Sequence, residues 1–150
     1  MRAAMRSGWR KGVGREELEE RFCMADSDTT IAQLRRQVAD FVARRDWQQF
    51  HTPKNLAMSL AIEAAELMEH FQWLTPEQSQ AVIDRPEQLR EVGEELADVL
   101  CYGLALANVL GIDLAGALEA KMVKNGQKYP EEKYRGRFGP KDPGAAADAG

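Results

Sequence analysis

Two apolar segments of this chain each carry a pair of acidic residues three positions apart. Glu63 and Glu66 lie in LAIEAAELMEHF, and Glu95 and Asp98 lie in EELADVLCYGLALANVLG. Residues three apart on a helix lie side by side on one face. Each segment would therefore present two neighbouring carboxylates on one side of a helix, which restricts the chain to folds in which both pairs find a shared partner.

The acids occupy positions that ordinarily face a core. Glu63 continues the helical apolar stripe that Leu56 and Leu60 begin. Asp98 is expected to be enclosed as well, because residues 96–101 are otherwise apolar. An unpaired buried carboxylate is costly or becomes protonated. A divalent cation held by all four carboxylates would resolve this conflict.

The chemistry of the four acids favours a hard cation. Carboxylates without nitrogen or sulfur donors suit Mg²⁺, with Mn²⁺ as a substitute. A di-iron bundle would show Glu-x-x-His on two helices, and neither His51 nor His70 lies three residues after a glutamate. Because Mg²⁺ bound by carboxylates keeps positions for water and substrate phosphates, the pattern indicates phosphoryl chemistry.

The rest of the chain is expected to be helical. No segment alternates with period two or carries a hairpin turn signal. We expect four main helices over residues 29–45, 53–71, 86–110 and 114–128, with a short helical turn at 75–78. Thr52 followed by Pro53 marks one helix start, and Gly111 marks a helix end. Short connections favour antiparallel neighbours, so the expected fold is all-α and four-helix-bundle-like, with antiparallel helices and the two acidic helices facing each other.

Length and charge limit the other possibilities. A chain of 150 residues fits one domain, which we place at 28–135 between a disordered extension (1–27) and a disordered tail (136–150); Met1 and Met24 are alternative starts. A net charge of -4 gives no reason to expect a nucleic acid or a membrane as partner. Two cysteines are too few for a disulfide scaffold, which favours a cytoplasmic location.

Further motifs surround the two acid pairs. A gap of 28 residues separates Glu63-x-x-Glu66 from Glu95-x-x-Asp98, RDWQQFH precedes the first pair, and FQW follows it. Tyr102 follows the second pair, and KMVKNGQKYP ends the fourth expected helix. With these spacings the sequence resembles the MazG-like superfamily of all-α nucleoside triphosphate pyrophosphohydrolases, and within it the dCTP pyrophosphatase branch. The resemblance implies Mg²⁺-dependent hydrolysis of a nucleoside triphosphate to the monophosphate and pyrophosphate, in a homodimer or homotetramer.

Carried over by position, the resemblance assigns metal binding and catalysis to Glu63, Glu66, Glu95 and Asp98. It assigns substrate binding to Trp47, His51, Trp73, Tyr102, Lys121, Asn125 and Lys128. The two tryptophans resemble the walls of a base site, where stacking is worth about 1–3 kcal/mol per base. The fourth-helix residues share one face and resemble a grip on the phosphates. The alternatives are core packing for the aromatic residues and favourable interaction with the helix dipole for the lysines.

One position departs from the dCTP-preferring relatives. Val38 stands where they carry a histidine on the base side. Because valine neither donates nor accepts a hydrogen bond, the preferred base stays open, with a pyrimidine deoxynucleotide such as dCTP expected. The expected role is house-cleaning of the nucleotide pool. The alternative is a non-catalytic sensor or interaction protein that binds Mg²⁺ and a nucleotide on the same fold.

Overall fold

The computed structural model describes residues 25–137, and every regular element in that range is a helix. The elements are α3 (Ile31–Ala43), the 3-10 helix η1 (Gln48–Phe50), α4 (Pro53–Glu69), α5 (Pro76–Gln80), the 3-10 helix η2 (Ala81–Asp84), α6 (Pro86–Leu110), α7 (Leu114–Lys128) and α8 (Glu131–Tyr134). The all-α class is thereby confirmed for these residues. The disorder expected over 1–27 and 136–150 falls mainly on residues 1–24 and 138–150, which lie outside the described range.

Local capping explains where the helices begin. The Thr30 side chain accepts a hydrogen bond from the backbone N–H of Gln33, and the Gln33 side-chain oxygen accepts one from the backbone N–H of Thr30, so α3 starts with a capping box. Thr75 starts α5 in the same way. Thr52 caps α4, with Pro53 as its first residue. The helix starts read from threonine and proline are therefore confirmed.

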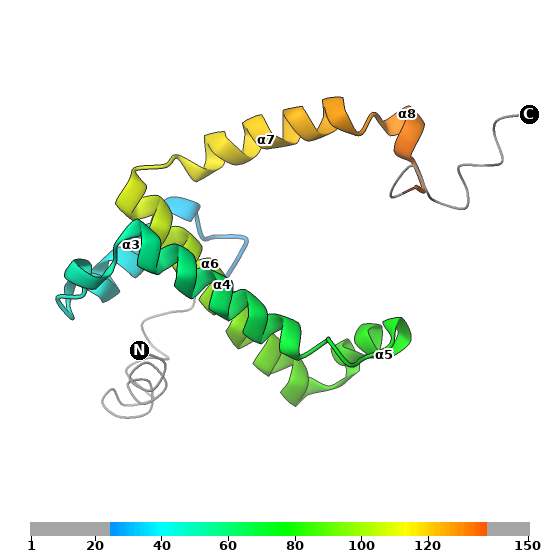
Figure 1. The fold of residues 1–150 in the computed structure, drawn as a ribbon, viewed down its shortest axis with the longest axis horizontal. Helices are drawn as coiled ribbons and strands as arrows, with labels where there is room; N and C mark the ends of the chain where they lie inside the picture. The colour runs from blue at the N-terminus through cyan, green and yellow to red at the C-terminus, as the bar shows by residue number, and fades with distance from the viewer. Residues whose placement is uncertain (1–24, 138–150) are drawn as a thin grey trace, which may run out of the picture.

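The two acid-bearing helices pack against each other along their lengths. α4 and α6 run antiparallel, and α3 crosses the end of α6 near its last turns (Figure 1). The centre of this packing is formed by Leu56, Tyr102 and Ala105, with Val38 from α3 against them. The prediction that the acidic helices face each other is confirmed.

The fourth long helix leaves this core. Gly111 ends α6 with a left-handed backbone conformation (φ 65°), which glycine adopts without strain. The α6 and α7 axes then differ by 105°, so α7 extends away from the α4–α6 pair instead of returning along it (Figure 1). None of the α7 side chains is buried. Within the described residues, the antiparallel return expected from the short connection therefore does not occur, because the chain turns by this angle after the left-handed Gly111.

The lengths and compositions of α6 and α7 also bear on whether a helix of this chain could span a membrane. No single helix among the described residues is both long and apolar enough to cross a membrane. The α6–α7 pair meets the length and composition limits only when its two bent halves are taken together.

Candidate metal and nucleotide site

Three carboxylates meet between the packed helices. Glu63 and Glu66 on α4 and Glu95 on α6 each place an oxygen within 4.8 Å of the other two. All three residues are half-buried or buried. In an octahedral Mg²⁺ site the oxygen ligands lie at about 2.1 Å from the ion, so opposite ligands are about 4.2 Å apart. Small side-chain rotations would therefore let these oxygens share one ion, and the donor set fits a hard divalent cation.

Asp98, the fourth predicted ligand, lies three residues beyond Glu95 on α6 and outside this group of three. Asp98 is exposed, and Leu96 and Leu100 beside it are 56% and 51% exposed. The expectation that apolar neighbours enclose Asp98 is therefore wrong for a single chain. The apolar side chains next to Asp98 are themselves about half exposed, so they do not cover its carboxylate.

Tyr102 connects the core to the acids. Tyr102 is buried, with only 9% of its surface exposed. Burial, and next the negative charge of Glu63, raise the pKa of its hydroxyl to about 12, with a smaller upward effect from Asp98 and an opposing hydrogen bond with Ser59. The hydroxyl consequently stays protonated near neutral pH, as a hydrogen-bond donor close to the acid cluster.

The motif at residues 45–51 forms a stack of rings between α3 and α4. The Trp47 ring meets Phe41 edge-on, with centroids 5.9 Å apart, and lies nearly parallel to His51 at 17° and 6.5 Å. The Arg45 guanidinium lies 3.6 Å from the centre of the Phe41 ring. His51 Nδ1 is 2.7 Å from the Trp47 carbonyl oxygen. The structure therefore brings the predicted base-side residues Trp47 and His51 together.

Trp73, the second predicted wall of the base site, lies elsewhere. Trp47 precedes α4, whereas Trp73 follows it, in the turn before α5. The 17 residues of α4 correspond to a helix about 25 Å long. Trp73 is also 86% exposed. A single chain therefore does not bring both tryptophans to one base.

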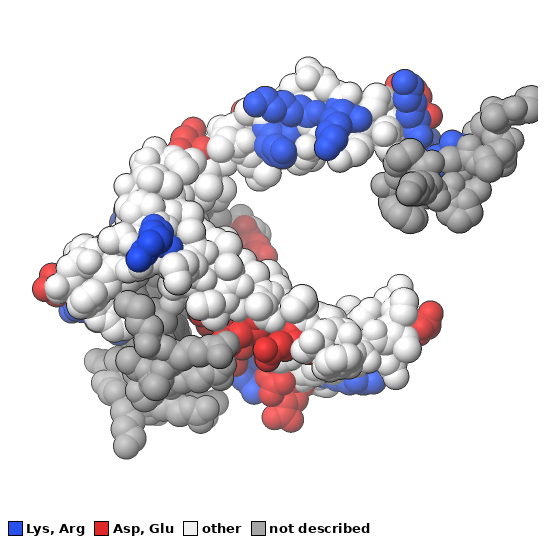
Figure 2. Space-filling model, viewed as in Figure 1, with Lys and Arg blue, Asp and Glu red and all other residues white. Residues whose placement is uncertain are grey.

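The predicted phosphate grip is also separate from the acids. Lys121 and Lys128 are exposed, Asn125 is half-buried, and all three belong to α7. Figure 2 shows lysine and arginine side chains gathered over α7 and α8, away from the acidic group over the α4–α6 pair. The Lys128 ammonium lies 4.9 Å from the centre of the Tyr129 ring. Within one chain these cations do not reach the carboxylates.

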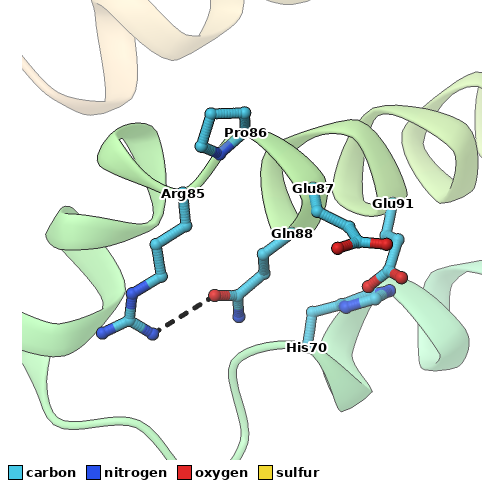
Figure 3. A pocket seen from close by; sticks show the side chains of 6 residues that line it. All are labelled: His70, Arg85, Pro86, Glu87, Gln88 and Glu91. Atoms are coloured by element: carbon cyan, nitrogen blue, oxygen red, sulfur yellow. Dashed lines mark hydrogen bonds between the residues drawn. The ribbon is translucent and has the colours of Figure 1, made fainter.

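A shallow hollow lies where α4 ends and α6 begins. It has a volume of about 530 Å³ and is lined by His70, Arg85, Pro86, Glu87, Gln88 and Glu91 (Figure 3). None of these residues is among the site residues predicted from the sequence. The signal was present, because His70 follows Glu66 by four residues and Glu91 precedes Glu95 by four, so each lies one turn from the acid cluster on its helix. The hollow thus extends the acid-bearing faces towards the turn that holds Trp73.

The sequence profile of the MazG-like family matches residues 58–137, more than half of the chain, including both acid pairs and the α7 lysines. The chain belongs to the MazG-like family. Among MazG-like relatives, it is similar to dCTP pyrophosphatase 1 of Rattus norvegicus, with 41% identity over 73% of this chain and 64% of the relative. The corresponding Mus musculus protein is 39% identical over 86% of this chain and 76% of the relative.

A solved MazG-like structure gives the same picture. The chain resembles the crystal structure of a pyrophosphatase from Archaeoglobus fulgidus, with a TM-score of 0.63 and 41% identity over 71% of this chain and 98% of that one. The resemblance drawn from the acid pairs and surrounding motifs is thereby confirmed. The match spans slightly less than two thirds of the rat relative's length, 64%.

Proposed function

We propose that this chain is a Mg²⁺-dependent nucleoside triphosphate pyrophosphohydrolase, a hydrolase of acid anhydrides. Its substrate would be a pyrimidine deoxynucleotide such as dCTP, and its products the monophosphate and pyrophosphate. The observation that carries the proposal is the cluster of Glu63, Glu66 and Glu95, whose oxygens lie within 4.8 Å of one another. The relatives named dCTP pyrophosphatase 1 support the choice of substrate. We place this activity in the cytoplasm, as house-cleaning of the nucleotide pool.

Different residues of the chain would bind the cation and contact the substrate. Glu63, Glu66 and Glu95, together with Asp98, would hold Mg²⁺ or Mn²⁺. The bound cation supplies charge neutralisation for the triphosphate and for the departing pyrophosphate. Tyr102, whose pKa of about 12 keeps it protonated, would donate a hydrogen bond to a sugar or phosphate oxygen beside the acids.

The base would stack on Trp47. Its ring is already held edge-on by Phe41, so little ordering remains when a base arrives, and stacking contributes about 1–3 kcal/mol. His51 lies next to the same ring. Val38 packs against the core that contains Tyr102 and offers no polar contact, so the base side depends on the 45–51 loop.

We infer that a second copy of the chain completes each site. The acids lie on the α4–α6 pair, whereas α7 carries Lys121 and Asn125 away from that pair and Trp73 lies about one α4 length, some 25 Å, from Trp47. A triphosphate needs positive charge near its phosphates and a second wall for its base. The α7 helix and Trp73 of a neighbouring copy would supply both.

The apolar surface supports this assembly. Large apolar side chains that are 40% to 60% exposed occur on α4, α6 and α7: Met58, Ile62, Leu96, Leu100, Leu118 and Met122. An isolated helix such as α7 is marginal in water unless its apolar side is packed. Exposed apolar surface on several neighbouring elements is typical of association. We propose a homodimer as the smallest working unit, with a homotetramer as a pair of such dimers.

The test is a product assay with dCTP, dUTP and dTTP in the presence of Mg²⁺. Formation of monophosphate and pyrophosphate, lost in Glu66→Gln and kept in Glu69→Gln, would support the proposal; Glu69 is an exposed acid on the same helix. Release of diphosphate and orthophosphate would overturn the assigned cleavage position. Tight nucleotide binding without any metal-dependent product would show the non-catalytic sensor instead.

A further inference from the structure

The connection between α6 and α7 is bound by a side chain of a third helix, α3. Gly111 ends α6 in the left-handed conformation, and the Ile112 N–H then donates back to the Ala107 carbonyl oxygen at 3.0 Å. This pattern is the Schellman motif, which closes a helix end. The Ile112 carbonyl oxygen accepts a hydrogen bond from Arg35 Nη1 at 2.9 Å. Arg35 therefore binds the connection itself, between the end of α6 and the start of α7.

The other nitrogens of the same guanidinium bind the last turns of α6. Nε donates to Asn108 Oδ1 at 2.8 Å, and Nη2 donates to the Ala107 carbonyl oxygen at 3.3 Å. A guanidinium is planar, so its donors keep fixed directions relative to one another. Because Nε and Nη2 are bound to α6, the end of α6 also sets the place of Nη1. The Ile112 carbonyl, bound to Nη1, is thereby held in one position relative to α6.

Apolar packing adds little restraint at the start of α7. Within residues 25–137, no side chain of α7 is buried. A hollow of about 280 Å³ lies between the first turns of α3 and α7, lined by Ile31, Ala32, Arg35, Asp113, Leu114 and Ala115. Since a hollow takes the place of close packing there, the hydrogen bonds of Arg35 carry much of the restraint on the direction of α7.

The direction of α7 sets the positions of its proposed phosphate-binding residues. Lys121 lies seven residues beyond Leu114, the first residue of α7, which places it about 10 Å along the helix axis. A change of about 10° at the connection would therefore displace Lys121 by about 2 Å. Hydrogen-bond lengths vary by only about 0.5 Å. A change of a few degrees would thus be enough to weaken a contact with a phosphate oxygen.

We propose that Arg35 is a positioning residue of the triphosphate site, because its bond to the Ile112 carbonyl oxygen fixes the direction of α7 and with it the places of Lys121 and Asn125. The link to the phosphates rests on the proposed function. Arg35 acts through α7 and has no contact with the substrate. Its loss should therefore move α7, an effect beyond a lower free energy of unfolding.

Two substitutions separate the bond to Ile112 from the rest of the contact. In Arg35→Gln the side-chain NH₂ takes the place of Nε and still donates to Asn108, but no donor reaches the Ile112 carbonyl. In Asn108→Ala the reciprocal bonds between Arg35 and Asn108 are lost, whereas the bond to Ile112 is kept. Asn108→Ala is thus the matched control for lost stability. If Arg35→Gln does not fold, Arg35→Lys replaces it, because one ammonium group cannot reproduce the planar set of donors.

Residual dipolar couplings of the backbone amides in the full chain measure the direction of α7 without any substrate. The wild type is expected to show one orientation of α7, at about 105° to α6. In Arg35→Gln the couplings of α4 and α6 should be kept, while those of α7 should become smaller or fit a different orientation. Asn108→Ala should keep the wild-type orientation. The melting temperature should fall in both variants, because both lose hydrogen bonds of the α3–α6 contact.

Kinetic measurements test the consequence for the site. With Mg²⁺, kcat/KM for dCTP should fall about 10-fold in Arg35→Gln, mainly through a higher KM, because the contacts from α7 bind the substrate. In Asn108→Ala it should stay within about 2-fold of wild type. The Mg²⁺-dependent rise in melting temperature should remain in both variants, since the clustered carboxylates lie on α4 and α6. A purely stabilising role predicts similar losses of activity in the two variants.

The inference would be overturned by a wild-type orientation of α7 in Arg35→Gln, or by equal changes of the α7 couplings in the two variants. A changed orientation with an unchanged KM would overturn the role in the triphosphate site. The proposed function is judged separately, by whether the wild type hydrolyses a nucleotide. If it does not, the dipolar couplings still decide whether Arg35 directs α7.

Discussion

Arg35 and Asn108 bind each other in both directions across the α3–α6 contact. Arg35 Nε donates to Asn108 Oδ1 at 2.8 Å, and Asn108 Nδ2 donates to the Arg35 carbonyl oxygen at 2.9 Å. The same guanidinium also donates to the carbonyl oxygens of Ala107 and Ile112, at 3.3 and 2.9 Å. One side chain of α3 therefore satisfies the end of α6 and holds the two helices that carry the Trp47 loop and Tyr102.

Arg35→Lys should destabilise the fold. A lysine can replace one of these donors but not the planar set, so the free energy of unfolding should fall by about 2 kcal/mol. Urea unfolding followed by circular dichroism measures the loss. Arg36→Lys, at the exposed neighbouring position, is the control and should change little. A double-mutant cycle with Asn108→Ala should show a coupling energy of about 1 kcal/mol or more; additive effects would contradict the reciprocal contact.

Tyr102 makes stability depend on pH in the alkaline range. Its folded-state pKa of about 12 lies above the ordinary value of 10.0, so the unfolded state releases this proton first as the pH rises. The contribution of the protonated hydroxyl to stability is complete below pH 10 and is lost between pH 10 and 12. The tyrosinate absorbance of the folded wild type should include a component with a midpoint at about pH 12. Tyr102→Phe should remove this component. An identical alkaline titration of both proteins would contradict this placement.

The acid cluster predicts cation-dependent stability. Mn²⁺ or Mg²⁺ bound to the folded chain should raise the melting temperature with increasing concentration, as binding to the native state alone requires. Glu63→Gln and Glu95→Gln should each remove most of this shift, because each deletes one of the three clustered carboxylates. Glu69→Gln, on the exposed side of α4, is the matched control. A full thermal shift in the Glu95→Gln variant would place the cation elsewhere.

Mixing two inactive variants tests whether sites are shared between copies. Glu63→Gln damages the acids and Lys121→Ala damages the α7 grip, so each protein alone should be weakly active. If α7 serves the acids of a neighbouring chain, half of the randomly mixed dimers hold one intact site, and activity should recover to about a quarter of wild type. Mixtures of either variant with itself are the control. Absence of recovery after subunit exchange would show that each chain uses its own α7.

Local features of the sequence predict the helices closely. Thr52 with Pro53 marks the start of α4, Thr75 with Gln78 forms the cap of α5, and Gly111 ends α6, because capping depends on only a few neighbouring residues. The meeting of Glu63 with Glu95 could be predicted too, because both acids lie on apolar faces of helices that pack against each other.

Features that depend on more distant surroundings could not be predicted in this way. The exposure of Asp98 depends on whether another element covers its face of α6. The apolar residues next to it in sequence do not determine this. The direction of α7 follows from the left-handed backbone of Gly111 at the end of α6, and no α7 residue is buried. The separation of Trp47 from Trp73 follows from the length of α4 between them, which the predicted helix over residues 53–71 already implies.

The bend of 105° between α6 and α7 has a consequence for how activity responds to dilution. If each site uses α7 of the neighbouring copy, a dissociated monomer has the carboxylates but lacks the lysines that would bind the phosphates. The activity per molecule would then fall, by mass action, once the protein concentration drops below the dissociation constant of the dimer. Halving the abundance of such an enzyme lowers its total turnover by more than half, so expression level alone would act as a threshold.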